Sequence, residues 1–254
     1  MTLAYKGLSI ENKWSLKMCA NKNTIDFKTF MPIYNKFRKT ENDKGIDMEP
    51  FAMPLFSLNL AKRYVVLNKY RTITKYLFEN QLGHMALDFG TGFGAFLPIL
   101  SRTYNNVVAV DAFDDQVTVA RDLVAFMKLS NVRVDKVRKD TGLSQFNDSE
   151  FDTILATDVL EHNSNYKDIV VELNRVLKPG GTLIVSLPRE HFLYRLFARR
   201  EVEHNEERGH VYHSSKGADI VEEFIAKQFK VIERVNVFTF LHIMFLRKLE
   251  SWFK

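Results

Sequence analysis

The fold of this chain is decided by the stretch Met85-Ala86-Leu87-Asp88-Phe89-Gly90-Thr91-Gly92-Phe93-Gly94-Ala95-Phe96. A short apolar run with an acid leads into a glycine-rich turn, and an apolar helical pattern follows directly. A strand, a glycine turn and a helix in this order build a nucleotide-sized pocket at the carboxyl end of the strand in α/β proteins. Glycine permits the tight turn and lets a ligand approach bare backbone. The free N–H groups at the start of the helix can receive polar ligand groups.

The composition suits one α/β domain with an elaboration, or two small domains. The 254 residues are 46% hydrophobic and 26% charged, with a formal net charge of +5. This mild excess permits contact with nucleic acid, anionic lipid or phosphorylated metabolites without indicating any of them. Cys19 is the only cysteine, which excludes an intramolecular disulfide. Residues 1–10 lack the pattern of a secretion signal, and no run reaches the roughly 18–20 apolar residues of a membrane span, so we expect a cytoplasmic protein.

The order of elements predicts an N-terminal helical extension or cap over residues 1–55 and one domain over residues 56–254. In that domain strands alternate with helices, which predicts a parallel, doubly wound sheet with crossovers of one hand. After the opening strand, we expect strands at 106–111, 132–138, 151–158, 182–187 and 229–238, and helices at 55–80, 96–104, 114–129, 166–177 and 214–227.

Two further segments complete this reading of the chain. Residues 241–254 could be a last strand with a tail, but the spacing of their apolar residues favours a final helix. Residues 188–213 interrupt the alternation and are rich in Arg, Glu, His and aromatic residues. An insertion at the carboxyl edge of the strands usually shapes the substrate side of such a site. Five basic residues of the 55–80 helix are interpreted as a solvated face: Lys62, Arg63, Lys69, Arg71 and Lys75.

The glycine spacing bears on which nucleotide the turn holds. The dinucleotide fingerprint is G-x-G-x-x-G, whereas here single residues separate Gly90, Gly92 and Gly94, and Asp88 lies two positions before the first of them. An acid at that place suits a ligand that brings positive charge to the turn and suits a pyrophosphate poorly. Asp111 ends the second strand and can accept two hydrogen bonds from a ribose diol, which fits either kind of cofactor.

The residues 87–94 resemble the first motif of class I S-adenosylmethionine-dependent methyltransferases, of the type that acts on small molecules or lipids. Four further matches follow in the expected order, at residues 108–111, 139–141, 151–162 and 173–181. The resemblance covers about residues 85–187. It implies a Rossmann-like, mostly parallel sheet of about seven strands with helices on both faces, and S-adenosylmethionine as the cofactor, with S-adenosylhomocysteine as the product.

The resemblance also implies a role for each matching residue. The backbone of the turn passes close to the methionyl part of the cofactor, Asp88 orients the turn and the cofactor's amino group, and Asp111 takes the ribose hydroxyls. The adenine lies beside Ala112, Asp140 and Thr141. Thr157 and Asp158 border the reacting sulfonium. The implied cofactor-binding residues are Asp88, Gly90, Thr91, Gly92, Asp111, Ala112, Asp140, Thr141, Thr157 and Asp158.

The reaction does not always need a catalytic base, because the sulfonium already makes the methyl group electrophilic. A base is needed only if the nucleophile must lose a proton early. His191 and Tyr194 follow the fifth strand on the substrate side, and His162 follows the fourth. In the resembled family His162 often serves structure. The histidines at 204, 210 and 213 match no standard metal-ligand spacing, so no metal is expected and a hydrogen-bonded lid is favoured there.

Some acceptors are excluded by the sequence. The turn after the fourth strand reads Thr157-Asp158-Val159-Leu160, without the Asn/Asp-Pro-Pro-Tyr-like turn of enzymes that methylate nucleic-acid bases or glutamine, and no cysteine is placed to attack a pyrimidine. A small-molecule, lipid-like, sugar or protein side-chain acceptor remains, with the small-molecule or amphiphilic acceptor favoured over nucleic acid. Residues 192–200 alternate aromatic and basic side chains, which favours a lid helix over a membrane-facing mouth for an amphiphilic substrate.

The prediction is therefore direct methyl transfer from S-adenosylmethionine, without a covalent enzyme intermediate. An NAD(P)-dependent oxidoreductase is the first alternative, against which the glycine spacing and the Lys178-Pro179-Gly180-Gly181 turn argue. A methyltransferase-like protein that binds the cofactor without turnover is the second. Peripheral contact with a membrane stays an alternative to a purely cytoplasmic location.

Overall fold

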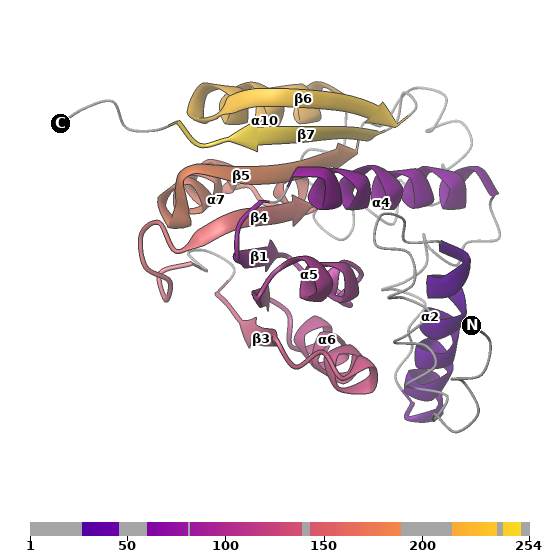
Figure 1. Cartoon of the computed structure of the whole chain (residues 1–254). Helices are drawn as coiled ribbons and strands as arrows, with labels where there is room; N and C mark the ends of the chain where they lie inside the picture. The colour runs from indigo at the N-terminus through magenta and orange to yellow at the C-terminus, as the bar shows by residue number, and fades with distance from the viewer. Residues whose placement is uncertain are drawn as a thin grey trace, which may run out of the picture.

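The computed structural model describes residues 27–45, 60–80, 82–138, 143–188, 215–237 and 241–249 (Figure 1). Its centre is one sheet of seven strands, in the order β3-β2-β1-β4-β5-β7-β6. The strands are β1 (Met85–Phe89), β2 (Asn106–Asp111), β3 (Val132–Lys136), β4 (Phe151–Thr157), β5 (Leu177–Pro188), β6 (Lys230–Val237) and β7 (Leu241–Arg247).

The direction of the strands confirms the predicted, mostly parallel sheet. β1 pairs in parallel with β2 and β4, β2 with β3, and β4 with β5. β7 pairs antiparallel with both β5 and β6, so the mixed edge is confined to this hairpin. Because β1 and β4 are neighbours whose connections leave in opposite directions along the sheet, their carboxyl ends form the crevice where open α/β sheets bind ligands.

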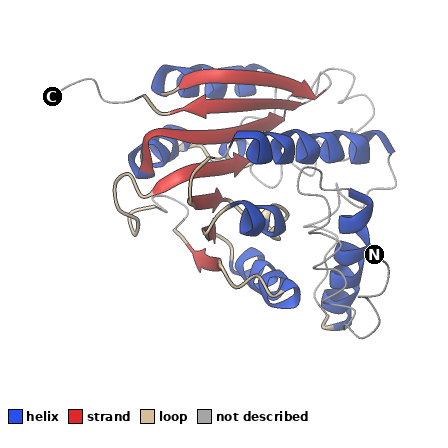
Figure 2. Ribbon diagram, in the orientation of Figure 1, coloured by secondary structure: helices blue, strands red, loops and turns tan. Residues whose placement is uncertain are grey.

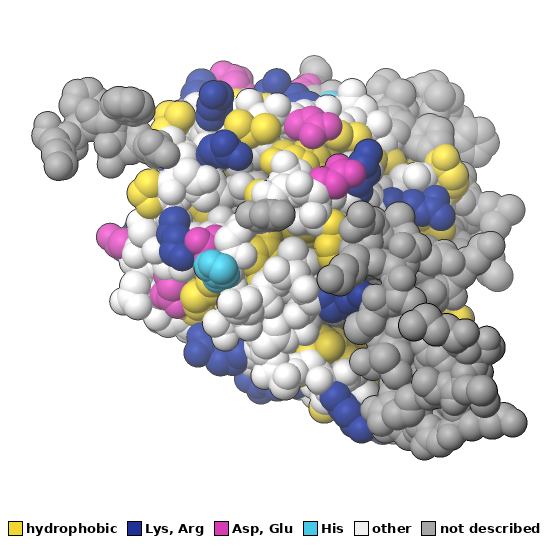
Figure 3. Space-filling model, viewed as in Figure 1, with side chains coloured by type: hydrophobic (Ala, Val, Ile, Leu, Met, Phe, Trp, Pro, Cys, Tyr) yellow, Lys and Arg dark blue, Asp and Glu magenta, His cyan; other side chains and the backbone are white. Residues whose placement is uncertain are grey.

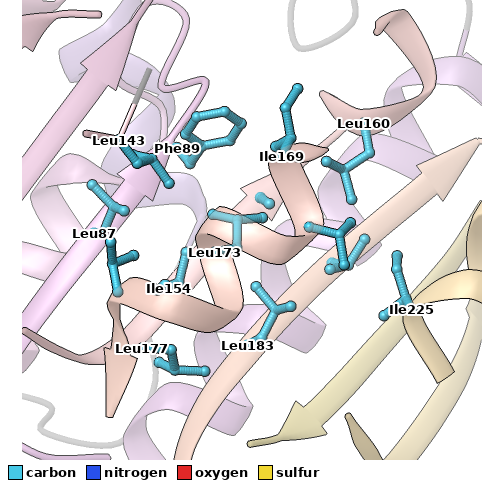
Figure 4. Close-up of a cluster of buried hydrophobic side chains, with 14 of the residues drawn as sticks. Leu87, Phe89, Leu143, Ile154, Leu160, Ile169, Leu173, Leu177, Leu183 and Ile225 are labelled. Carbon is cyan, nitrogen blue, oxygen red and sulfur yellow. The ribbon is translucent and has the colours of Figure 1, made fainter. Parts of the chain in front are cut away.

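Helices cover both faces of the sheet, as predicted (Figure 2). One face carries α4 (Leu60–Asn80), α5 (Leu97–Thr103) and α6 (Asp114–Met127), which pack with α2 (Phe27–Asp43) in one apolar cluster. The other face carries α7 (Tyr166–Val176) and α10 (Ser215–Gln228). Figure 4 shows this second cluster, where Ile169 and Leu173 of α7 lie over Leu87, Ile154 and Leu183 of the sheet.

The alternation along each strand explains how one sequence fills both clusters. Ala86 of β1 belongs to the cluster of α4 and α5, and Leu87 belongs to the cluster of α7. Side chains of consecutive strand residues point to opposite faces, so a central strand buried on both sides is mostly apolar, with Asp88 the exception in β1. Pro98 lies in the first turn of α5, where its missing N–H has no partner to lose.

The prediction of a final helix at 241–254 is wrong, because residues 241–247 form β7. Ile243 and Phe245 are buried in one cluster, and Met244 and Leu246 in the other. A strand buried on both faces has no polar–apolar alternation, so its period cannot be told from that of a buried helix. Residues 250–254 lie outside the described part of the chain.

The turn predicted at 178–181 is also corrected, since β5 already begins at Leu177. The Gly180 amide donates to the Lys248 carbonyl, and the Lys248 amide donates to the Gly181 carbonyl. Pairing with the chain after β7 therefore continues the strand through the glycines, with Gly180 at φ 72° as a local bend.

α2 falls within the predicted N-terminal extension. Phe37 of this helix packs on Phe126 of α6 with ring centroids 5.5 Å apart, and Lys44 just beyond it lies 3.0 Å from Asp122. Among the described helices, none is long and apolar enough to cross a lipid bilayer. On the face drawn in Figure 3, acidic and basic side chains of the described residues are interspersed.

Candidate functional site

The glycine turn after β1 has the backbone geometry that its sequence predicts. Gly90, Gly92 and Gly94 have φ angles of 71°, 57° and 87°, in the left-handed region that favours glycine. The amides of Gly90 and Thr91 both donate to the Val110 carbonyl of β2, at 2.9 and 3.0 Å. The turn is therefore held against the neighbouring strand by its backbone.

Two of these glycines meet different surroundings. An ideal Cβ on Gly90 would lie 2.3 Å from a methyl carbon of Val159, so the turn packs directly on the segment after β4. An ideal Cβ on Gly92 would meet only the Gln116 side-chain oxygen, at 3.6 Å. The backbone of Gly92 is thus open on the side where a ligand would approach, with a polar group from α6 above it.

Asp88 is buried at 2% exposure within β1. Its Oδ2 accepts a hydrogen bond of 2.7 Å from the Thr91 hydroxyl. Burial raises the pKa of Asp88 to about 7, although the Thr91 bond acts to lower it, and the charge of Asp111 raises it further. A positively charged ligand would stabilise the ionised form of this buried carboxyl.

Asp111 ends β2 and joins the two strand ends. Its two oxygens accept from the amides of Gly92, at 2.9 Å, and Phe113, at 3.1 Å. Burial raises the pKa of Asp111, and the amides of Gly92, Phe113 and Ala112 act against that rise. The half-buried Ala112 follows directly. Asp140 and Thr141, predicted beside the adenine, lie outside the described residues.

Thr157 and Asp158 lie where β4 ends, as expected, and Thr157 pairs in register with Ser186 of β5. Asp158 has a positive φ of 53° and forms an ion pair with Lys69 of α4. Its other carboxylate oxygen accepts from the Ser186 hydroxyl. Burial acts to raise the pKa of Asp158, but the Lys69 charge and the two hydrogen bonds hold it below its usual value.

The prediction that Lys69 belongs to a solvated face is therefore wrong. Only 9% of the residue is exposed, whereas Lys75 and Arg71 of the same helix are exposed as predicted. The next residue, Tyr70, donates from its hydroxyl to the Ala95 carbonyl beyond the glycine turn. Tyr34 of α2 donates to the same carbonyl at 2.7 Å. Helical spacing gave no sign of these contacts, because they depend on partners in other elements of the fold.

Of the three catalytic candidates, the structure describes His162 alone. His162 is half-buried in the 3-10 turn Leu160–His162, with Nε2 3.7 Å from Oε1 of Glu161. Glu161 is fully buried, and in the described part of the chain neither of its carboxyl oxygens has a hydrogen-bond partner. His191 and Tyr194 lie outside the described residues, as do the histidines at 204, 210 and 213. Among the described residues no group of three His, Cys, Asp or Glu could hold a metal ion.

The residues at the turn fit the cofactor that the sequence motifs imply. The Gln116 side-chain oxygen is buried, accepts no hydrogen bond from the described residues and lies above the open backbone of Gly92. Buried polar atoms are rarely left without a partner. An adenosyl ligand carries both hydroxyl and amino donors, so this oxygen fits a ligand with that chemistry.

Comparison with known proteins agrees with this geometry. Residues 87–185 match the family model described as a methyltransferase domain. A demethylmenaquinone methyltransferase of Tropheryma whipplei is 34% identical over 122 residues, which are 46% of this chain and 49% of that protein. The human mitochondrial ubiquinone biosynthesis O-methyltransferase is 25% identical over 184 residues, 70% of this chain and 48% of that protein. The chain thus spans about half the length of these relatives.

Solved structures show the same fold at lower identity. A SAM-dependent methyltransferase from Aquifex aeolicus has a TM-score of 0.55 and 21% identity, covering 85% of this chain and 98% of its own. The N-methyltransferase NodS of Bradyrhizobium japonicum, solved with S-adenosylhomocysteine, has a TM-score of 0.60 and 15% identity, covering 84% of this chain and 99% of its own. Together with the family match, which covers residues 87–185, this likeness confirms the predicted fold, that of a class I methyltransferase domain.

Proposed function

We propose that this protein transfers a methyl group from S-adenosylmethionine directly to a small-molecule acceptor and releases S-adenosylhomocysteine. The observation that carries the proposal is the hydrogen bond from the Gly92 amide to Asp111, which joins the turn after β1 to the acid after β2. When bound, S-adenosylmethionine supplies a methyl group that its sulfonium already makes electrophilic. The protein's part is then to orient the reactants and to exclude water.

The cofactor's amino group is assigned to Asp88 and the backbone of Gly90, Thr91 and Gly92. Asp88 carries a carboxyl whose ionisation is disfavoured by burial. A neighbouring ammonium group would favour the ionised form of this carboxyl. The two charges would then attract each other strongly in a buried, low-dielectric environment. The Thr91 hydroxyl, which donates to Asp88, fixes the orientation of that carboxylate.

The ribose and adenine are assigned to the residues after β2. Asp111 keeps lone pairs on both oxygens after accepting the amides of Gly92 and Phe113, so two ribose hydroxyls can also donate to it. Ala112 follows at the position expected beside the adenine, with Asp140 and Thr141 completing that side. Gln116, whose oxygen receives no hydrogen bond from the residues that the structure describes, is added to this set.

The transfer side is assigned to Thr157 and Asp158, next to the glycine turn through the contact of Gly90 with Val159. The catalytic candidates remain His162, His191 and Tyr194, any of which would act as a base toward an acceptor that must lose a proton.

The acceptor is proposed to be a quinone-like small molecule. This rests on the relatives named for ubiquinone biosynthesis and for demethylmenaquinone. Such a molecule is amphiphilic, which agrees with an insertion at 188–213 on the substrate side of the domain 56–254 and a helical cap at 1–55. A cytoplasmic protein with peripheral contact to a membrane would suit delivery of this acceptor.

The test is calorimetry of the purified chain with S-adenosylmethionine, S-adenosylhomocysteine and NAD, followed by transfer of a labelled methyl group to quinone precursors. Binding of both adenosyl compounds and not of NAD is expected. Binding of NAD alone would establish the oxidoreductase alternative. Binding of the adenosyl compounds without transfer to any acceptor would favour a methyltransferase-like protein that has no catalytic activity. Asp111→Ala should weaken S-adenosylhomocysteine binding by at least about tenfold, because two charge-assisted hydrogen bonds are lost. Unchanged affinity would remove Asp111 from the ribose role.

A further inference from the structure

Lys69 is a buried cation at the carboxyl edge of the sheet that the cofactor assignment leaves without a role. It projects from α4 to Asp158 at the end of β4, and its side chain is 11% exposed. The neighbouring Tyr70 reaches Ala95, just after the glycine turn. α4 therefore holds this lysine against the strand end assigned to the transfer side, while the next residue contacts the chain just after the glycine turn.

The partners around Asp158 leave donor capacity on Lys69. One oxygen of Asp158 accepts from Lys69 and the other accepts from the Ser186 hydroxyl. An ammonium group has three N–H donors, and within the described residues Asp158 is the hydrogen-bond acceptor that Lys69 contacts. Burying a lysine is costly unless its donors are used.

Glu161 supplies an independent sign of a ligand at the same place. It is fully buried and interacts electrostatically with Asp158 and Lys69, and neither of its carboxyl oxygens accepts a hydrogen bond from the described residues. Burial, followed by the charge of Asp158, raises the pKa of Glu161 well above its usual value. The spare donors of Lys69 and the unsatisfied carboxyl of Glu161 therefore leave hydrogen-bonding capacity for a ligand at this strand end.

We propose that Lys69, held by Asp158, binds an ionised hydroxyl oxygen of the methyl acceptor, so that the acceptor is a molecule with an acidic hydroxyl, such as a phenol or an enol. This inference rests on the proposed methyl transfer. The hydroxyl proton leaves to water when the acceptor ionises, and the ammonium stabilises the oxygen anion that remains.

A purely structural ion pair is the competing explanation, since Lys69 also fixes Asp158 in its left-handed backbone conformation. The two explanations differ in what they predict for a bound phenol. A structural clamp alters stability alone, whereas a binding cation lowers the pKa of a phenol that lies against it.

The experiment uses 4-nitrophenol, whose ionised form is coloured, bound to the full chain saturated with S-adenosylhomocysteine. Absorbance measured against pH gives the pKa of the bound phenol. We expect the wild type to lower that pKa by about one to two units, since an opposite charge within a few ångströms has this effect. Lys69→Arg should keep the shift, and Lys69→Met should abolish it. Lys75→Met is the matched control, because Lys75 lies exposed on the same helix.

A second variant guards against misfolding of Lys69→Met, which leaves Asp158 without its cation. The double substitution Lys69→Met with Asp158→Asn removes both charges, and asparagine tolerates the left-handed conformation. Loss of the shift in this variant, with S-adenosylhomocysteine still bound, supports the proposal. A shift that survives it, or no shift in the wild type, overturns the proposal and leaves the methyltransferase assignment standing. Failure of the wild type to bind S-adenosylhomocysteine would overturn that assignment itself.

Discussion

Replacing Asp88 by asparagine should stabilise the protein without ligand while weakening cofactor binding. The asparagine oxygen can still accept the hydrogen bond of 2.7 Å that Thr91 donates to Asp88, so the substitution removes charge and little else. The pKa of Asp88 rises from 3.8 to about 7 on folding, chiefly through burial. Each pKa unit corresponds to about 1.4 kcal/mol, so keeping this carboxylate ionised costs roughly 4 kcal/mol of folding free energy, as an upper figure.

The sign of this effect fixes its pH dependence. Below about pH 4 the carboxyl is protonated in the folded and the unfolded chain, so wild type and Asp88→Asn differ little. As the pH rises, the unfolded chain releases its proton first and the wild type loses stability until the folded carboxyl ionises near pH 7. Urea unfolding followed by circular dichroism, from about pH 4 to about pH 8, should show the variant gaining a growing advantage over wild type. A difference that stays constant across this range would refute the reasoning.

Binding of the ligand should favour the ionised form of Asp88 in the wild type. An ammonium group next to Asp88 lowers its pKa, so binding of S-adenosylhomocysteine near neutral pH should release a proton. Calorimetry in two buffers of different ionisation enthalpy measures this release, which Asp88→Asn should not show. Proton release of equal size from both proteins would place the ammonium away from Asp88.

Two further substitutions test the turn and the start of the sheet. Gly90→Ala should destabilise the protein by clearly more than Gly45→Ala. Both glycines have a positive φ, where a side chain costs about 1–2 kcal/mol. The new Cβ at Gly90 would also lie 2.3 Å from Val159, whereas at Gly45 it would meet nothing within 4 Å. Chemical denaturation compares the pair, and equal losses would contradict the packing argument. Asp152→Asn should lower stability above about pH 4 and lose that effect on acidification. Burial acts to raise the pKa of Asp152, but Lys178 and two backbone amides hold it below its usual value; a deficit that persists in acid would show a loss other than charge.

The sequence predicts best what neighbouring residues decide together. The strand, turn and helix at residues 85–103 are local, and the acids Asp88 and Asp111 follow from strand ends that each stretch defines by itself. The structure places both acids around one turn, where Asp88 accepts from Thr91 and Asp111 accepts from Gly92. A parallel pair such as β1 and β2 brings its carboxyl ends to the same edge, so local prediction suffices for this half of the candidate site.

Prediction failed where partners distant in the chain decide the outcome. β7 is a strand because β5 and β6 lie on either side of it and both of its faces are covered. The apolar run of β7 does not by itself reveal these neighbours. Lys69 has the spacing of a solvated residue, yet it is buried against a strand end far along the chain. A buried ion pair depends on the tertiary position of both partners, so single-helix periodicity could not reveal it.

The two consecutive residues Lys69 and Tyr70 give α4 a part in the site that neither contact alone would imply. Tyr70 fixes the helix to the Ala95 carbonyl beyond the glycine turn, and Lys69 fixes it to Asp158 after β4. Gly90 meanwhile packs on Val159, one residue after Asp158. The turn and the strand end are thus joined twice, directly and through the helix. Since reacting groups must be held in close register for methyl transfer, a change in α4 should disturb both halves of the site together, even though the family match begins only after this helix, at residue 87.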